Sequence, residues 1–196
     1  MGRPAKHDPD DFIDAAVELF ARGGARSVAL SAVAASIGAA NGSIYHRFAD
    51  RASLLAAMWL RTSARFERGY RGQLGEPNLE SVVAVGPWVV EWCRDHPAEA
   101  QVLQAGLRAF GPDDWPPEAR AALTTPDDIR RDLRRIAKRL AASTSATPDE
   151  IAFAMLELPI AIVRRALHAG RAPGKREVDL VRGLMARILG DPSDRT

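Results

Sequence analysis

The chain has 196 residues, of which 46% are hydrophobic and 27% charged, with a net charge of +2. This is enough apolar material for one or two packed domains, and the slight positive charge permits an anionic partner without demanding one. The single cysteine excludes an internal disulfide and a cysteine-based metal site. No apolar run approaches the roughly 18 residues of a membrane span, and the start MGRPAKHDPDD lacks the apolar core of a secretory signal. We therefore expect a cytoplasmic protein.

Helical periodicity runs along most of the sequence, and no segment shows the alternation of a strand. The first helix is expected within residues 8–24, where acidic residues and a proline precede an apolar stripe and Gly23-Gly24 ends it. Two short helices are predicted at about 30–37 and 41–48. A longer helix follows, with Asp50 as its expected N-cap.

The breaker-rich stretch GQLGEPN predicts a domain boundary near residues 71–78. Beyond it, the pattern predicts helices at about 78–95, 98–110, 117–143, 148–169 and 175–189. Pro87 and Pro159 interrupt two of them, and each is expected to end or kink its helix. TTPDD at 124–128 is a further candidate break. Thr147 is expected to cap the helix whose first position is Pro148.

Residues 30–48 fit two helices joined by a tight turn at Gly38, which can adopt positive φ without penalty. Apolar side chains of both helices would face inward. The other side of the second helix offers small or hydrogen-bonding side chains suited to a major groove. From spacing alone, an ordinary helical hairpin in a bundle is an equal alternative.

The segment AAVELFARGGARSVALSAVAASIGAANGSIYHRFADRASLL, residues 15–55, resembles the DNA-binding domain of the TetR family of transcriptional repressors. The matching residues are Phe20, Gly24, Val33, Ala34, Gly38, Gly42, Ile44, Tyr45, Phe48 and Arg51. The resemblance implies an all-α fold. A three-helix helix-turn-helix unit would occupy 1–50, extended to about 71 by a connecting helix, and a ligand-sensing and dimerisation bundle would occupy 72–196.

Two alanines depart from the family pattern. Ala29 and Ala40 stand where the family often has Ser or Thr before each helix of the motif, so Ser27 or Ser31 is expected to cap the first helix and Asn41 the second. Residues 1–50 hold five Lys or Arg and six Asp or Glu, so phosphate binding must come from placement rather than from net charge. The expected DNA-binding residues are Arg3, Lys6, Ser31, Asn41, Gly42, Ser43, Tyr45, His46, Arg47 and Arg51.

Several of these residues carry a specific expectation. Tyr45 is expected to bury its ring and offer its hydroxyl to a phosphate, and Phe48 is expected in the core. Arg3 and Lys6 lie on an N-terminal arm that either tracks the DNA or is simply a disordered terminus.

Aromatic and soft residues of the C-terminal part either pack in its core or line a cavity for an apolar ligand. The candidate pocket residues are Phe66, Trp88, Trp92, Phe110, Trp115 and Met155, with Trp115 on a loop that could lid the pocket; Phe153 is expected in the core. Cys93 is expected as a buried apolar residue and His96 as a helix-end residue. The basic run at 130–139 is most simply a solvated helix face.

The last two predicted helices are apolar over more than one stripe, so each needs two neighbours. The family resemblance implies that they form a four-helix homodimer interface, and the alternative is that both are buried within one subunit. No nucleophile elbow, metal-spaced histidine pair or phosphate loop is present, so neither an enzyme nor a bound cofactor is expected. The resemblance implies a repressor that leaves a palindromic operator when a small apolar inducer binds. The alternative is a helical small-molecule-binding or adaptor protein that has lost DNA binding.

Overall fold

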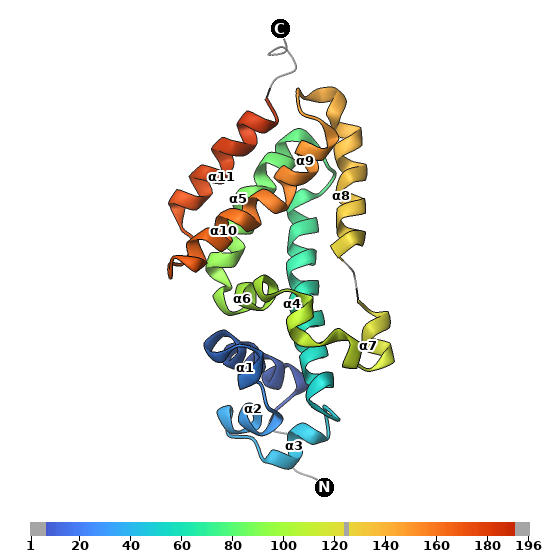
Figure 1. The fold of residues 1–196 in the computed structure, drawn as a ribbon, viewed down its shortest axis with the longest axis vertical. Coiled ribbons are helices and arrows are strands. Elements are labelled where there is room, and N and C mark those ends of the chain that lie inside the picture. The colour runs from blue at the N-terminus through green and yellow to red at the C-terminus, as the bar shows by residue number, and fades with distance from the viewer. Residues whose placement is uncertain (1–6, 124–125, 191–196) are drawn as a thin grey trace. The chain divides into compact units, whose positions relative to one another are not determined.

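The computed structural model describes residues 7–123 and 126–190. These two ranges form helices joined by turns and loops, and they contain no strand (Figure 1). This confirms the all-α prediction. The helices are α1 (Pro9–Gly23), α2 (Leu30–Ser36), α3 (Asn41–Tyr45), α4 (Arg51–Leu74), α5 (Leu79–Asp95), α6 (Pro97–Ala105), α7 (Pro117–Ala121), α8 (Pro126–Leu140), α9 (Pro148–Met155), α10 (Glu157–His168) and α11 (Lys175–Ile188).

These helices form two compact units. The first comprises the described residues up to Arg65 together with Ala98–Leu123, and the second comprises Phe66–Pro97 together with the described residues from 126 onward. Helix α4 contributes to both. The observed units therefore interleave along the chain, whereas the predicted domains are 1–50 and 72–196 with α4 as a connector. The assignment of DNA binding to the first predicted domain and of ligand sensing to the second stays a prediction.

The first unit has one apolar core built from α1 to α4 and from the segment after α5. Phe12 and Phe20 of α1, Ile44 of α3 and Leu54 of α4 are almost fully buried there. Phe110 and Trp115 belong to the same core, each 2% exposed, and the Trp115 indole nitrogen donates to the Phe110 carbonyl at 2.8 Å. Of the two possibilities for Trp115, packing in a core is confirmed and a lid over a pocket is not, because its loop turns the indole into the core of the first unit.

Local capping explains where several helices begin. Asp8 and Asp11 form a reciprocal capping box at the start of α1, with Pro9 in the first turn. The predicted cap at Asp50 is confirmed, since its carboxylate accepts from the Ser53 backbone N–H at 2.7 Å. These hydrogen bonds to Ser53 lower the pKa of the Asp50 carboxyl.

Thr147 caps α9 as predicted, in a capping box with Glu150 and with Pro148 in the first turn. His96 is the C-cap of α5, as expected of a helix-end residue.

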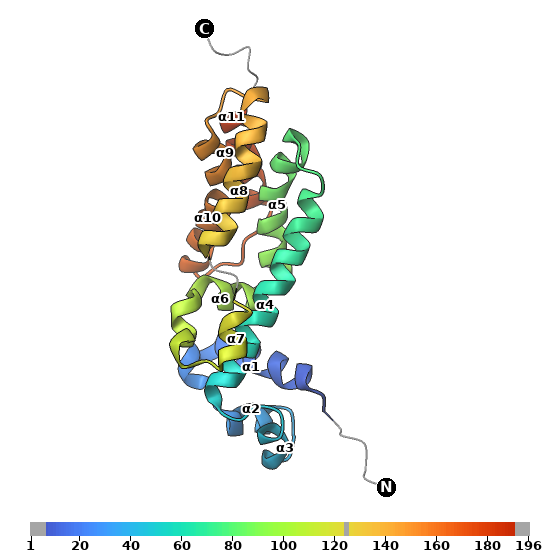
Figure 2. The ribbon, with the colours of Figure 1, turned by 90° about the vertical axis from the view of Figure 1, so that its right-hand side faces the viewer.

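In the second unit, α5 packs against the C-terminal helices, since both α10 and α11 contact it. Helix α8 contacts α9, and the two are seen together in Figure 2. Gly86 of α5 allows a close approach to α11, because a Cβ there would lie 2.2 Å from the Met185 sulfur. Cys93 is buried as predicted, and burial raises the pKa of its thiol to about 12.

Helix ends in the C-terminal part differ from the predicted ones. The helix predicted at 98–110 ends at Ala105, where Gly106 has φ 75°, and a 3₁₀ turn follows at Leu107–Phe110. The segment predicted at 117–143 is two helices, α7 and α8, consistent with the candidate break at 124–128. The segment predicted at 148–169 breaks at Leu156, three residues before Pro159, where the missing proline N–H removes a helical bond. Helix α5 continues through Pro87.

Candidate nucleic-acid interface and ligand cavity

Helices α2 and α3 form the predicted helix-turn-helix. The turn between them contains Gly38 with φ 65°, and the Ala39 N–H donates back to the Ala34 carbonyl at 2.9 Å. Positive φ is costly for residues with a Cβ, so glycine here permits the tight reversal. The inner faces bury Leu30, Val33 and Ile44. The predicted role of Gly38 is confirmed.

The outer face of α3 is open to solvent. Asn41, Gly42, Tyr45 and His46 are exposed, and Ser43 is half-buried. Tyr45 is 54% exposed, so the expectation of a buried Tyr45 ring is wrong: Ile44 and Phe48 fill the core side and leave the tyrosine outside. A large aromatic side chain left exposed beside polar groups is available to a partner.

Gly42 is not required by the fold of α3. Its φ is not in the left-handed region, and a Cβ at this position would meet nothing within 4 Å. Glycine inside a helix costs roughly 0.5–1 kcal/mol relative to alanine. A glycine that the fold does not need keeps this surface free for the close approach of another backbone.

Neither helix of the motif has a side-chain cap. Helix α2 starts after Ala29 and α3 after Ala40, and neither start carries a capping hydrogen bond. The expected replacements are wrong. Ser27 donates to the Leu19 and Gly24 carbonyls, Ser31 is exposed at the second position of α2, and Asn41 is already the first residue of α3. Helix α3 therefore begins without a side-chain acceptor for its first backbone N–H groups.

Two of the predicted DNA-binding arginines make internal contacts. Arg47 donates to the carbonyls of His7 at 2.7 Å and Ser43 at 2.9 Å. Arg51 donates to the carbonyls of Val28 and Ala25, where the 3₁₀ turn Ala25–Ser27 leads into α2. Both guanidinium groups therefore hold parts of the unit together. The predicted contacts of Arg3 and Lys6 lie outside the described residues.

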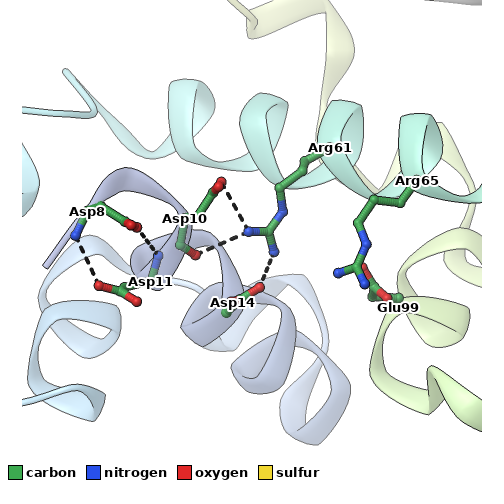
Figure 3. Close-up of polar contacts among 7 residues, drawn as sticks. All are labelled: Asp8, Asp10, Asp11, Asp14, Arg61, Arg65 and Glu99. Carbon is green, nitrogen blue, oxygen red and sulfur yellow. Dashed lines mark hydrogen bonds and ion pairs between the residues drawn. The ribbon is translucent and has the colours of Figure 1, made fainter.

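Three ion pairs tie α4 to its neighbours in the first unit, and no pattern in the sequence predicted them. Arg61 pairs with Asp10 and Asp14 of α1, and Arg65 donates to the Glu99 carboxylate of α6 at 2.9 Å (Figure 3). Glu99 is only 7% exposed. Their residues are 34 to 51 positions apart in the chain, so no local spacing rule could have paired them.

A cavity of about 660 Å³ lies in the second unit, within the range of small-molecule sites. One wall is the C-terminal half of α4, with Phe66, Tyr70 and Leu74. The opposite wall is α8, with Ile129, Leu133 and Ile136, and Leu156 at the break between α9 and α10 adds to the lining. The expectation that 130–139 is only a solvated face is therefore wrong for the inner side of α8, whereas Arg130, Arg131 and Arg134 do face solvent.

The predicted pocket residues separate into three groups. Phe66 lines the cavity, and Trp88 and Trp92 pack on it with ring-centroid distances of 5.6 and 5.0 Å. Met155 is fully buried and its carbonyl accepts from the Tyr70 hydroxyl at 3.0 Å. Phe110 and Trp115 lie in the core of the first unit. Phe153, expected in the core, is 48% exposed on α9.

Two groups in the lining of the cavity have raised pKa values. Burial raises the pKa of the Glu67 carboxyl, and the nearby Arg71 charge only partly offsets this effect. Burial, with a smaller contribution from the charge of Glu157, raises the pKa of the Tyr70 hydroxyl. The described ranges hold no cluster of His, Cys, Asp and Glu able to bind a metal ion. No helix in the described part of the chain is long and apolar enough to cross a membrane.

Comparison with known proteins agrees with the geometry. Residues 12–58, which span α1 to the first part of α4, match the sequence profile of the TetR family of bacterial regulatory proteins. No curated protein matches the chain.

Solved structures share the fold over nearly the whole chain. A TetR-family regulatory protein from Rhodococcus RHA1 superposes with a TM-score of 0.72 at 20% identity, covering 93% of this chain and 96% of that one. FadR from Bacillus subtilis, solved in complex with stearoyl-CoA, superposes with a TM-score of 0.70 at 17% identity, covering 93% and 98%. The fatty acid degradation regulator FadR from Bacillus halodurans gives 0.69 at 18% identity, covering 94% and 97%.

Proposed function

We propose that this chain, which belongs to the TetR family of bacterial regulatory proteins, is a dimeric repressor that binds a palindromic operator through α3 and leaves it when a ligand enters the α4–α8 cavity. The observation that carries the DNA-binding part is the outer face of α3. It presents Tyr45 and His46 to solvent beside Gly42, on a helix-turn-helix that the family profile covers.

Operator recognition follows from that face and its surroundings. In a dimer, two α3 helices would enter successive major grooves about 34–36 Å apart. Asn41, Ser43 and His46 offer hydrogen-bonding groups to base edges. Arg47 and Arg51 donate to backbone carbonyls of the same unit, so the first contacts to phosphate would come from Tyr45, the start of α3 and the N-terminal residues. With few charged contacts to phosphate, DNA affinity should depend only weakly on salt concentration.

A homodimer is supported by the surface of α11. Leu180, Leu184 and Ile188 are spaced four residues apart and stay half-buried, and they lie next to the buried stripe of Val178, Val181 and Met185. The apolar surface of α11 is therefore wide enough for two neighbours. Within the chain α11 packs on α5, and the second stripe would pack against a second copy.

A response to ligand is supported by α4, because this helix contributes to both units. The same helix supplies Leu54 and Met58 to the core of the first unit and Phe66 and Tyr70 to the cavity wall. A ligand that prefers one position of this helix would shift the population of DNA-binding dimers. FadR of Bacillus subtilis, with the same fold, was solved with stearoyl-CoA, which supports an apolar ligand for this chain as well.

The test is fluorescence anisotropy with labelled DNA from upstream of the protein's own gene, against a random duplex of equal length. Competitor-resistant binding whose affinity falls only modestly between about 50 and 300 mM salt supports the repressor. Binding equal to that of random DNA for every native upstream fragment would favour a protein that keeps the fold without the function.

A further inference from the structure

One side of the α4–α8 cavity is lined by apolar side chains and offers a ligand almost no hydrogen-bonding group. Leu74 and Leu133 are buried, and Phe66 and Ile136 are half-buried. The one polar group on this side, the Tyr70 hydroxyl, already donates to the Met155 carbonyl at 3.0 Å. A ligand held only by this wall would be an aliphatic or aromatic body with no specific head.

The rim of the cavity is different because it carries an excess of cations. Four cationic residues line it, Arg71, Arg135, Lys138 and Arg139, against two carboxylates, Glu67 and Asp132. Asp132 is paired with Arg135 at 3.5 Å, and Arg71 lies one helical turn from Glu67. Among the described residues, no carboxylate pairs with Lys138 or Arg139.

The cations of α8 at the cavity rim differ from those elsewhere on the same helix. Away from this cavity, Arg130 pairs with Glu157 at 3.3 Å and Arg134 lies 3.9 Å from Asp149. Of the four cations that line the cavity, Lys138 and Arg139 have no such partner among the described residues. Arginine and lysine at the mouth of an apolar cavity can bind an anionic group while their stems cover the apolar part of the ligand.

We propose that the cavity binds an amphiphile whose aliphatic chain lies along the apolar wall and whose anionic headgroup, a carboxylate or a phosphate, is held at the rim by Arg139 and Lys138, with Arg71 nearby. This inference rests on the proposed function, since it names the class of ligand for the same cavity. Neutral apolar molecules of equal length bind more weakly, and each added methylene tightens binding about fourfold until the wall is covered.

The experiment measures binding of three twelve-carbon probes to the full chain: laurate, lauroyl-CoA and lauryl alcohol. Isothermal titration gives affinities, and the fluorescence of Trp88 and Trp92, which pack on the cavity residue Phe66, gives a second signal. We expect at least one anionic probe to bind about tenfold more tightly than the alcohol, as two partly exposed ion pairs allow. Tighter laurate indicates a carboxylate head, and tighter lauroyl-CoA indicates a phosphate-bearing head.

Matched variants locate the headgroup. The double variant Lys138→Gln with Arg139→Gln removes two rim cations, and Arg131→Gln with Arg134→Gln removes two from the outer side of the same helix. The rim variant should lose about tenfold in affinity for the anionic probe and keep its affinity for the alcohol, whereas the outer variant should change both less than twofold. Glu67→Gln should tighten binding of the anionic probe because it removes a negative charge from the lining.

The results separate this inference from the proposed function. Equal affinity for the alcohol and both anions, equal effects of the two double variants, or no binding of any probe would overturn the inference, even if the chain binds its operator. Charge-selective binding that depends on Lys138 and Arg139 supports it, even if no operator is found.

Discussion

The guanidinium of Arg47 lies over the ring of Phe12, 5.4 Å from its centroid, while it donates to the His7 carbonyl. Arg47 lies two residues after the end of α3, and Phe12 is fully buried in α1. The arginine therefore connects the end of α3 to α1 by a cation–π contact and a hydrogen bond. A residue that the sequence indicates as a DNA contact thus has a structural role first.

Replacing Arg47 with alanine is expected to lower the free energy of unfolding by about 1–2 kcal/mol, because two carbonyls lose a charged donor. Operator affinity should fall in the same variant. Urea unfolding followed by circular dichroism measures the first effect and anisotropy the second. Arg26→Ala removes an exposed arginine of the same unit and should stay within about 0.5 kcal/mol of the parent. Equal stability of the two variants would contradict the structural role.

Tyr45→Ala should show the opposite profile. The ring is more than half exposed and packs little, so stability and dimer formation should be unchanged while operator affinity falls about tenfold, the loss of one hydrogen bond to a charged group. Tyr45→Phe separates the hydroxyl from the ring, and an equal loss in that variant would assign the effect to the hydroxyl. Unchanged affinity in Tyr45→Ala would remove α3 from the DNA interface.

Local signals account for what the sequence predicted well. The capping residues Asp50 and Thr147 and the turn at Gly38 act within a few residues, so their spacing is sufficient to place them. The buried stripe of α1 follows from its period alone. The resemblance of residues 15–55 to the TetR family then favoured a DNA-binding helix-turn-helix over an ordinary helical hairpin.

Features that depend on distant contacts were missed. Trp115 reads as a loop residue, but its burial depends on packing with Phe110 and the helices of the first unit. The basic run of α8 reads as a solvated face, and only the opposite wall from α4 makes its inner side a cavity lining. Likewise, arginine stems are long enough to turn inward, so Arg47 and Arg51 could not be assigned to DNA or to the core by position.

Gly69 and Gly72 lie on α4 but have different surroundings. A Cβ at Gly69 would lie 2.6 Å from the Trp88 ring, whereas a Cβ at Gly72 would meet nothing within 4 Å. Gly69→Ala should therefore destabilise the second unit by about 1–3 kcal/mol through overpacking. Gly72→Ala should stabilise it by about 0.5–1 kcal/mol through helix propensity.

Thermal unfolding and near-ultraviolet circular dichroism check this pair. The tryptophan signal should change in Gly69→Ala and stay the same in Gly72→Ala, because only the first displaces the indole. If both variants gain stability alike, Trp88 moves aside freely and the close approach of α4 to α5 imposes no constraint.

Alkaline pH should weaken the fold through Cys93. Burial raises the pKa of its thiol from 9.0 to about 12, so between these pH values the unfolded chain releases a proton that the native state keeps. The unfolded state then binds fewer protons, and the free energy of unfolding falls as pH rises through this window by at most ~1.4 kcal/mol per pH unit.

Urea unfolding at pH 8, 9 and 10 under reducing conditions measures how steeply the free energy of unfolding falls with pH. These pH values stay near or below the ordinary pKa of tyrosine, which limits the contribution of Tyr70. Cys93→Ala should be less stable at pH 8 because of the lost packing, yet its stability should fall less between pH 9 and 10. Parallel curves for the parent and the variant would mean that the thiol ionises as easily in the folded chain as in the unfolded one.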